Sequence, residues 1–288
     1  MDAVRWWKRQ GVRILMYHRF ADAAALDRQC AHIREYSKPI SMSAVAEWLE
    51  SGRDAEPYSI AVTVDDGYRD FLGVAHPVFA KYAIPVTVFV VSDFLDGKRW
   101  LWFDQVLWAF KRARGPQAAD EARRFVARAK EVSEAERLEL LRELPAEIPE
   151  QPPPEYRPLS WDEVRLLAAR GVEFGAHTKT HPILSRVRGG DQLREEITGS
   201  KARLEAELGA PAAHFCYPNG RMADIGAAAV EAARAAGFRT AVTAEPGVNQ
   251  AGADPFLLRR IGADPTHEEL YFQRAVAAFR IGASRDYA

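Results

Sequence analysis

The sequence predicts an α/β fold in which parallel strands are joined by crossover helices, and three observations support this class. Short apolar or β-branched runs alternate along the chain with amphipathic stretches of helical period. The 288 residues, of which 48% are hydrophobic, suffice to bury a large core. The apolar run at 84–91 is too short to span a bilayer and is typical of a buried strand.

Seven strands are predicted, each followed by a polar or helical segment. They cover residues 12–17, 61–64, 85–91, 172–176, 213–217, 238–243 and 257–261. The periodicity predicts helices over residues 27–36, 42–51, 70–82, 161–170, 191–208 and 223–236. The helix at 161–170 has a marked start, because Ser160 and Glu163 have the spacing of a capping box. Strand–helix alternation of this kind is typical of a parallel sheet or barrel.

Residues 97–157 break this alternation. A segment of about sixty residues is too long for a simple strand–helix connection, so we predict one domain over residues 1–288 with a helical insertion at about 97–157. Four large aromatic side chains mark the start of the insertion. They either stack on sugar rings or pack the insertion against the rest of the fold, and packing is favoured: Trp100, Trp102, Phe103 and Trp108.

Charge and cysteine content limit the class of partner and compartment. Lys and Arg (39) nearly balance Asp and Glu (40), giving a net charge of -1, which argues against nucleic-acid binding. Cys30 and Cys216 lack a paired spacing, which favours a reducing compartment. With no signal peptide or transmembrane segment visible, we expect a cytoplasmic protein. Trp6 and Trp7 beside basic residues allow weak peripheral membrane contact, although a packed turn is favoured.

Two adjacent carboxylates follow the predicted strand at 61–64. Asp65 and Asp66 lie at its C-terminal end, and Gly67 then allows a sharp turn. Active sites of parallel barrels lie at these ends. Adjacent side chains at a strand end point in different directions, so one carboxylate can bind a metal while the other acts as a base. The alternative is an ordinary Asp-Asp-Gly turn with both acids in solvent.

Two histidines follow the strand at 172–176. His177 and His181 stand four residues apart, and one helical turn would place both imidazoles on one face, within reach of a single cation. Pro182 disfavours helical geometry at His181, so the turn is expected to be irregular. The alternative is a pair of partly exposed polar residues at a helix start.

The two segments support each other, since both emerge from strand ends on the same rim. Two histidines and one carboxylate leave coordination positions open, as a catalytic metal requires. Zinc would lower the pKa of a bound water to about 7, and the second carboxylate would accept a proton from it. The expected chemistry is hydrolysis of an acyl bond.

These segments resemble two motifs of the polysaccharide deacetylases, carbohydrate esterase family 4, also called the nodulation-type chitooligosaccharide deacetylase homology domain. VTVDDGY at 62–68 is similar to the first motif, which makes Asp65 the catalytic base and Asp66 a metal ligand. HTKTH at 177–181 is similar to the second, which makes His177 and His181 the other ligands. The resemblance implies a distorted (β/α)7 barrel, in agreement with the seven predicted strands. It also implies a divalent ion, with zinc expected and cobalt, nickel or iron as alternatives.

Two later segments resemble the family less closely. CYPNG at 216–220 is similar to the third motif, usually Arg-x-Pro-Tyr-Gly, whose backbone N–H at the position of Asn219 binds the oxyanion. Cys216 replaces the usual arginine, which removes a charge that would orient the base; a simple Pro-Asn-Gly turn is the alternative reading. LLRRIGAD at 257–264 resembles the strand that supplies an arginine to the catalytic Asp. Arg260 is the expected residue, with Arg259 as the alternative because strand alternation sends one of them inward.

The family's general acid is a histidine in a C-terminal Leu-His motif that this chain lacks. In the branch that resembles poly-N-acetylglucosamine deacetylases, the chain is permuted and the histidine arrives near the N-terminus. The first predicted strand ends in ILMYHRF, so His18 is the expected acid. It follows a strand on the inferred rim, where protonating a leaving amine is typically worth roughly 10² to 10⁴ in rate. A core histidine with a structural role is the alternative.

The resulting hypothesis is a metal-dependent hydrolase that removes acetyl groups from an N-acetylated, or less favoured O-acetylated, sugar, oligosaccharide or polysaccharide precursor. The carbohydrate substrate is implied by the resemblance and not by the residues themselves. Two alternatives stay open: a cyclic-amide hydrolase of the allantoinase type on the same scaffold, and a non-catalytic carbohydrate-binding protein.

Overall fold

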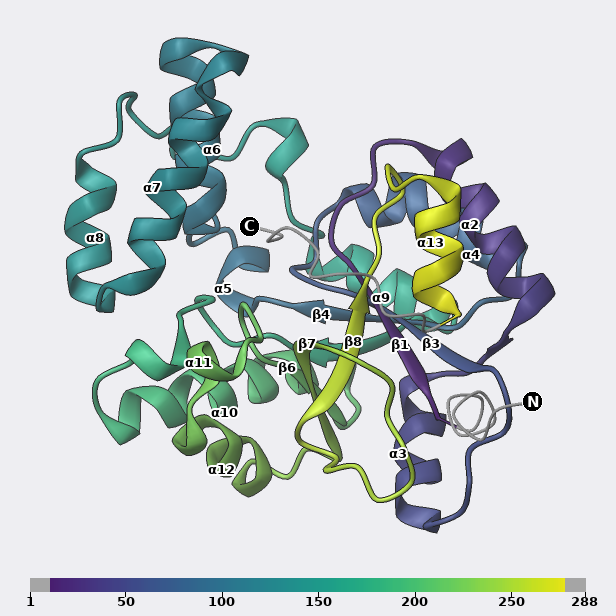
Figure 1. The fold of residues 1–288 in the computed structure, drawn as a ribbon. Helices are drawn as coiled ribbons and strands as arrows, with labels where there is room; N and C mark the ends of the chain where they lie inside the picture. The colour runs from purple at the N-terminus through teal and green to yellow at the C-terminus, as the bar shows by residue number, and fades with distance from the viewer. Residues whose placement is uncertain (1–10, 278–288) are drawn as a thin grey trace.

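A computed structural model describes residues 11–277 of the chain. Its centre is a closed barrel of seven parallel strands (Figure 1). Closure is shown by β1, which pairs with β3 through Leu15 and Val62 and with β8 through Leu15 and Ile261. The barrel strands are β1 (Arg13–Tyr17), β3 (Ser59–Val64), β4 (Val86–Val90), β5 (Glu173–Ala176), β6 (His214–Cys216), β7 (Thr240–Pro246) and β8 (Leu258–Gly262). The predicted (β/α)7 barrel is confirmed, and each predicted strand lies at its expected place.

One further strand escaped prediction. β2 (Lys38–Pro39) has two residues and pairs in parallel with Ser59 and Ile60 at the start of β3. Two residues are too few to show a period-two pattern, so no sequence signal marks such a strand.

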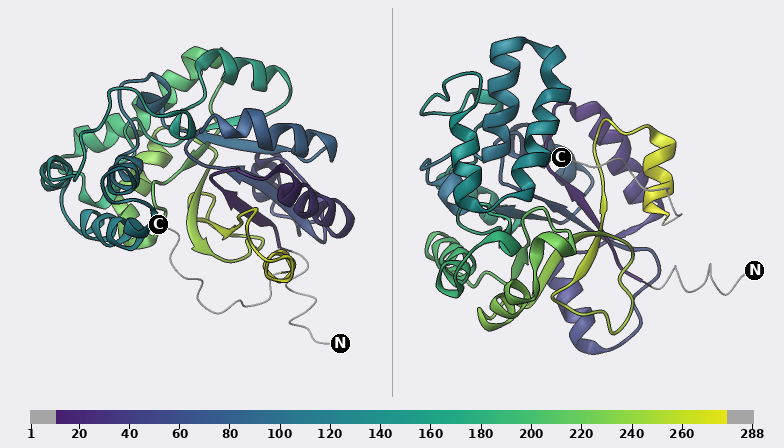
Figure 2. Two further views of the ribbon diagram at one scale, coloured as in Figure 1. Left: turned by 90° about the horizontal axis from the view of Figure 1, so that it is seen from above. Right: turned by 60° about the vertical axis from the view of Figure 1, so that its left-hand side comes forward.

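Helices cover the outside of the barrel (Figure 2). They are α2 (Ala23–Tyr36), α3 (Met42–Ser51), α4 (His76–Lys81), α9 (Trp161–Ala169), α10 (Gly190–Leu208), α11 (Met222–Ile225), α12 (Ala227–Ala235) and α13 (Glu269–Val276). The capping box of Ser160 and Glu163 is present at the start of α9. The helix predicted at 223–236 is broken at Gly226, which has φ 75°, and the one predicted at 70–82 begins with a π-helical turn, Phe71–Ala75. α13 was not predicted; it packs beside α2, where Phe272 contacts His32.

Most of the helices between β4 and β5 form a cluster at one side of the barrel (Figure 1). A short α5 (Ser92–Leu95) leads to α6 (Trp102–Arg114), α7 (Ala119–Glu131) and α8 (Glu134–Arg142). The last three share an apolar cluster of their own, which includes Val106, Phe110, Ala122 and Val126. This agrees with the helical insertion expected at 97–157, while the extent of a single domain over 1–288 stays a prediction.

Strand alternation divides the barrel core and positions the site. Even-numbered Ile14 and odd-numbered Ala61 belong to the cluster inside the barrel, whereas Leu15 and Val62 belong to the layer under the helices. Asp65 lies two steps of two residues beyond Ala61, so its side chain also points inward at the end of β3. The same rule turns Arg260 inward on β8 beside Leu258, and Arg259 outward.

Within residues 11–277, none of the helices combines the length and apolarity that a membrane crossing requires. The tryptophans considered for membrane contact, Trp6 and Trp7, lie outside the described residues.

Candidate metal centre and catalytic site

Asp65 and Arg260 form a buried ion pair at the C-terminal end of the barrel. Arg260 Nη1 donates to Asp65 Oδ1 and Nη2 to Oδ2, both at 2.7 Å. Arg260 is 2% exposed and also donates to the carbonyl of Thr243 and the hydroxyl of Thr63. Arg259 is exposed and donates instead to the carbonyl of Pro246. The two-pronged guanidinium bond fixes the orientation of the Asp65 carboxylate.

This pairing decides the protonation of Asp65. Burial alone would raise its pKa, but the Arg260 charge and its hydrogen bonds hold that pKa well below the ordinary value. The Asp65 charge in turn raises the pKa of Arg260 above its ordinary value, against the effect of burial. Asp65 is therefore an ionised carboxylate at neutral pH, as a general base must be.

Cys216, which replaces the usual arginine of the third motif, lies beside this ion pair. Its Sγ is 3.5 Å from Asp65 Oδ2 and 3.2 Å from Arg260 Nη2. Burial raises the pKa of the thiol, so it stays protonated and can donate weakly to the carboxylate. Cys216 carries no positive charge, and Arg260 of β8 supplies that charge to Asp65 instead. The sequence could suggest Arg260 only as one of two arginines, the other being Arg259.

Asp66, His177 and His181 are brought together as predicted, and all three are buried. Asp66 Oδ1 lies 3.5 Å from His177 Nε2 and 3.6 Å from His181 Nε2. Ions bound at about 2.0 to 2.2 Å to nitrogen and oxygen in tetrahedral geometry separate neighbouring donor atoms by roughly 3.4 Å. The distances therefore fit one shared cation, and the donor set of two imidazoles and one carboxylate suits a catalytic site with open positions.

A second group, Asp65, His177 and Cys216, also has donor atoms close enough for a cation. It fits less well, because Arg260 already occupies both oxygens of Asp65 and the Cys216 thiol is protonated. A guanidinium in bonding contact with one ligand repels a cation at the same place. The group of Asp66, His177 and His181 is therefore the better candidate centre.

The two histidines are held differently. His177 Nδ1 is 2.7 Å from the carbonyl of Cys216, a partner that fixes the ring and leaves Nε2 free to bind a metal. His181 Nδ1 is buried and has no hydrogen-bond partner among the described residues. Its ring instead contacts Phe103 of α6 edge to face, with centroids 5.4 Å apart. Burial lowers the pKa of His181 to about 3, which keeps it neutral and able to coordinate.

Backbone strain is concentrated in these motifs. Asp66 has φ 72°, Thr178 φ 67°, His181 φ 57° and Asn219 φ 56°, a left-handed conformation that costs residues with side chains about 1 to 3 kcal/mol. The turn at His181 is irregular, as Pro182 led us to expect, and is held by a bond from its N–H to the Thr178 hydroxyl. Such strain is typical of functional sites, where surrounding contacts hold the required geometry.

His18 reaches the site from the loop after β1. Its Nε2 lies 3.8 Å from Asp65 Oδ2, and its side chain is 42% exposed. This partial exposure argues against the alternative of a core histidine. Asn219 follows β6 on the same rim, and its side-chain Nδ2 is buried without a hydrogen-bond partner among the described residues.

Sequence reasoning missed the contacts between the insertion and the first motif. The Tyr68 hydroxyl donates to Asp104 of α6 at 2.6 Å, and the Arg19 guanidinium lies 4.0 Å above the Tyr68 ring. Burial raises the pKa of Asp104 to about 7. Trp100 and Trp102 are 4% and 6% exposed. Both side chains therefore pack inside the fold, the reading that the sequence favoured, and their rings are not available to stack on a sugar. In the sequence, only the tyrosine of VTVDDGY, next to Asp65 and Asp66, could have signalled this connection.

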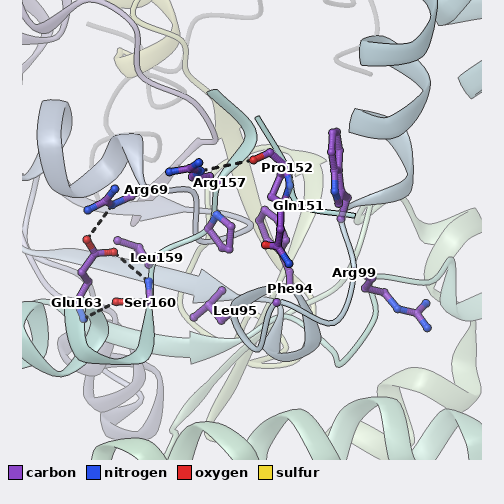
Figure 3. Close-up of a pocket in the computed structure, with 13 residues that line it drawn as sticks. Arg69, Phe94, Leu95, Arg99, Gln151, Pro152, Arg157, Leu159, Ser160 and Glu163 are labelled. Carbon is purple, nitrogen blue, oxygen red and sulfur yellow. Dashed lines mark hydrogen bonds and ion pairs between the residues drawn. The ribbon is translucent and has the colours of Figure 1, made fainter. Parts of the chain in front are cut away.

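A pocket of about 270 Å³ opens on the outer side of the first motif, between the barrel and the segment that returns from the insertion (Figure 3). Its apolar lining includes Phe94, Leu95 and Leu159, and its polar lining includes Arg69 and Arg157. None of the site residues described above lines it. It is therefore separate from the metal and base site.

Comparison with known proteins agrees with the fold and motifs. The family model described as polysaccharide deacetylase matches residues 52–241. Among curated proteins, none matches the chain in sequence. Similar solved structures include the Streptococcus pyogenes deacetylase PplD in complex with acetate, with 18% identity, 90% of this chain and 94% of that chain covered, and a TM-score of 0.62.

Two more structures have the same fold. IcaB from Ammonifex degensii has 20% identity and a TM-score of 0.63, covering 93% of this chain and 96% of its own. A de-N-acetylase from Aggregatibacter actinomycetemcomitans has 14% identity and a TM-score of 0.66, covering 92% of this chain and 99% of its own. At these identities the likeness establishes the fold.

Proposed function

The chain belongs to the polysaccharide deacetylase family, and on this premise we propose that it hydrolyses the acetamido group of an N-acetylated sugar unit. The observation that carries the proposal is the arrangement of an ionised, arginine-held carboxylate, Asp65, beside a buried cluster of Asp66, His177 and His181. Metal-dependent amide hydrolysis uses a base for water, a Lewis acid and an acid for the leaving amine.

Asp65 is the base in this scheme. Held by Arg260 and ionised, it would accept a proton from the attacking water, and the two hydrogen bonds from Arg260 fix the orientation of its carboxylate. A bound divalent ion, proposed to be zinc with cobalt, nickel or iron as alternatives, would activate the water and polarise the acetyl carbonyl. Asp66, His177 and His181 would hold it.

His18 is the proposed acid. Its Nε2 and the Asp65 carboxylate, 3.8 Å apart, face the same space, so a proton taken by one residue can be returned to the amine by the other. The partial exposure of His18 places it where a large substrate can reach it. The Asn219 N–H is the proposed donor to the oxyanion, since it belongs to the turn after β6 on the same rim.

An N-acetylated sugar is the proposed substrate because two of the structurally similar proteins are a deacetylase bound to acetate and a de-N-acetylase. O-acetyl groups are the second choice, since an alkoxide leaves more readily than an amide anion and depends less on a general acid such as His18. Both cysteines are buried and free, in line with the predicted reducing compartment. A cytoplasmic location stays a prediction.

The test combines metal analysis with acetate release. Purified protein is expected to contain close to one equivalent of a divalent ion, and His177→Ala to lose it together with activity. Acetate release is then measured on N-acetylglucosamine oligomers, acetylated xylan and allantoin. Release from the oligomers supports the proposal, whereas turnover of allantoin alone would overturn it in favour of a cyclic-amide hydrolase.

A matched variant separates an enzyme from a binding protein. Asp65→Asn removes the base but none of the three proposed ligands, so it is expected to keep the metal and lose acetate release by roughly 10² to 10⁴. If Asp65→Asn released acetate at the wild-type rate, Asp65 would not be the base.

A further inference from the structure

The 270 Å³ pocket beside the first motif has a charge pattern that its own residues do not balance (Figure 3). Three arginines line it: Arg69, Arg99 and Arg157. Among the described residues that line it, Glu163 is the one acid, and it accepts from Arg69 Nε at 2.8 Å. Arg157 donates to the neutral carbonyl of Pro152, at 3.5 Å. Two positive charges at the pocket thus remain unbalanced by acids of its lining.

Backbone pairing forces two of these arginines together. The chain returning from the insertion pairs antiparallel with the first motif, through an Arg69 N–H bond to the Arg157 carbonyl at 2.9 Å and a bridge between Tyr68 and Pro158. This register puts Arg69 directly opposite Arg157. Like charges opposite each other on paired strands are destabilising. Figure 3 shows both guanidinium groups on the same side of the pocket.

Trp100, which lines the same pocket, carries a buried hydrogen-bond donor. Trp100 is 4% exposed, and its Nε1 is buried without a hydrogen-bond partner among the described residues. The indole is fixed by stacking on Tyr156 at 5.9 Å and by edge contact with Trp108 at 5.9 Å. A buried N–H without an acceptor carries a free-energy cost. An acceptor bound in the pocket would remove that cost.

We propose that this pocket binds an oxyanion, a carboxylate or phosphate group carried by a sugar-sized ligand. The volume is near the lower end of small-molecule sites, roughly 300 Å³. Arg157, whose charge no acid of the lining balances, supplies the charge, the Trp100 N–H is the proposed donor, and the apolar side chains Phe94 and Leu159 border the body of the ligand. Planar guanidinium groups suit both carboxylate and phosphate oxygens.

The pocket also touches the catalytic motif. Leu95 lines it, and a Cβ placed on Gly67 would lie 3.2 Å from Leu95 Cδ1, so the pocket wall packs directly against the turn that follows Asp66. The Tyr68 ring contacts Phe94 with centroids 5.6 Å apart. An anionic group bound here would therefore lie one layer of side chains away from the proposed metal ligands.

Calorimetric titration of the full chain tests the proposal, with inorganic phosphate, glucuronic acid and glucose as separate ligands. We expect phosphate, glucuronic acid or both to bind at least about tenfold more tightly than glucose, and the stronger of the two identifies the group. If neither anion binds more tightly than glucose, the proposal is wrong.

Three variants locate the binding. Arg157→Gln removes one exposed charge and Trp100→Phe removes only the indole N–H, so each is expected to weaken anion binding about tenfold. Arg128→Gln, an exposed arginine of α7 away from the pocket, is the control and should bind as wild type. Equal affinity in all four proteins would place the anion elsewhere and overturn the proposal.

The same titration separates this proposal from the proposed function. His177→Ala should lose the metal yet bind the anion as wild type, because His177 does not line the pocket. Loss of anion binding in His177→Ala alone would assign the anion to the metal centre and overturn the pocket. Conversely, a chain that binds anions through Arg157 but releases no acetate would contradict only the deacetylase proposal.

Discussion

The barrel and the insertion each bury an arginine, and the two are treated in opposite ways. In the barrel, Arg260 gives both Nη groups to Asp65 and its Nε to a carbonyl. In the insertion, Arg137 of α8 is 1% exposed, pairs with Glu134 of its own helix and lies 4.9 Å over the Trp102 ring, but its Nη1 has no partner within residues 11–277. Burial lowers the pKa of Arg137 to about 10, whereas Asp65 raises that of Arg260.

The difference shows that the buried arginine of the barrel is held in one orientation by its partners, whereas the buried arginine of the insertion is not. Removing one partner of a fully buried pair is costly because it leaves a buried charge unpaired. Removing Arg137 leaves Glu134, whose side chain is 25% exposed and keeps contact with water, so no fully buried charge loses its partner. The barrel pair positions a proposed catalytic base, which requires every donor to be satisfied. The arginine of the insertion serves packing, and packing tolerates an apolar substitute.

The largest effect is expected from breaking the barrel pair. Arg260→Met should lower acetate release by roughly 10² to 10⁴, because Asp65 loses the charge that keeps it ionised and oriented. Removing that charge raises the pKa of Asp65, so the acid limb of the pH–rate profile should move to higher pH. Arg259→Met, on the outward face of the same strand, is the control for the profile. An unchanged acid limb in Arg260→Met would remove Arg260 from the proposed mechanism.

A smaller effect is expected at Asp104, where the insertion meets the barrel, and it concerns the free energy of unfolding. Asp104 of α6 has a pKa raised by burial to about 7, so between about pH 4 and pH 7 the folded state binds more protons than the unfolded state. Stability from this group is present at low pH and lost as pH rises toward 7, by an amount on the order of a few kcal/mol.

Asp104→Asn keeps an acceptor for the Tyr68 hydroxyl and removes the titration. Chemical denaturation at several pH values should show that the stability of this variant falls less than that of wild type between pH 4 and 7. Asp120→Asn, exposed on α7, is the matched control. Parallel curves for wild type and Asp104→Asn would show that Asp104 does not titrate in this range.

A third effect is expected where the insertion contacts the candidate metal centre. Phe103→Ala removes the ring that packs against His181, whose Nδ1 has no acceptor to hold it. Loss of such outer support typically costs 10-fold to 100-fold in metal affinity. Zinc competition with a chromophoric chelator measures this directly. Phe125→Ala removes a partly buried ring from the same helical cluster without touching His181, and should leave affinity unchanged.

The smallest effect is expected from Arg137→Met, the counterpart of the first prediction. A flexible apolar side chain of similar length fills the space, so the free energy of unfolding should change by less than about 1 kcal/mol or increase. Thermal and urea unfolding of wild type and variant provide the measurement. A loss of several kcal/mol would mean that Arg137 is as well paired as Arg260, and the contrast between the two regions would disappear.

Much of the fold was readable from the sequence because its signals are local. Strand and helix periods predicted the seven barrel strands and most of the helices, and the capping box marked the start of α9. What failed was short or unpatterned: the two-residue β2, the break at Gly226 and the terminal α13. These elements depend on partners distant in sequence, which no local window contains.

The sequence by itself determined the chemical identity of the site, since Asp65, Asp66, His177 and His181 follow strands whose ends must share one rim of a parallel barrel. Only the tertiary structure decided how those groups are held. The choice of Arg260 over Arg259 depends on one step of strand alternation. The contacts of Arg260 and Cys216 with Asp65 and the contact of Phe103 with His181 join residues between 78 and 195 positions apart. Such contacts arise from barrel closure, and their energies depend on distances that a linear pattern does not contain.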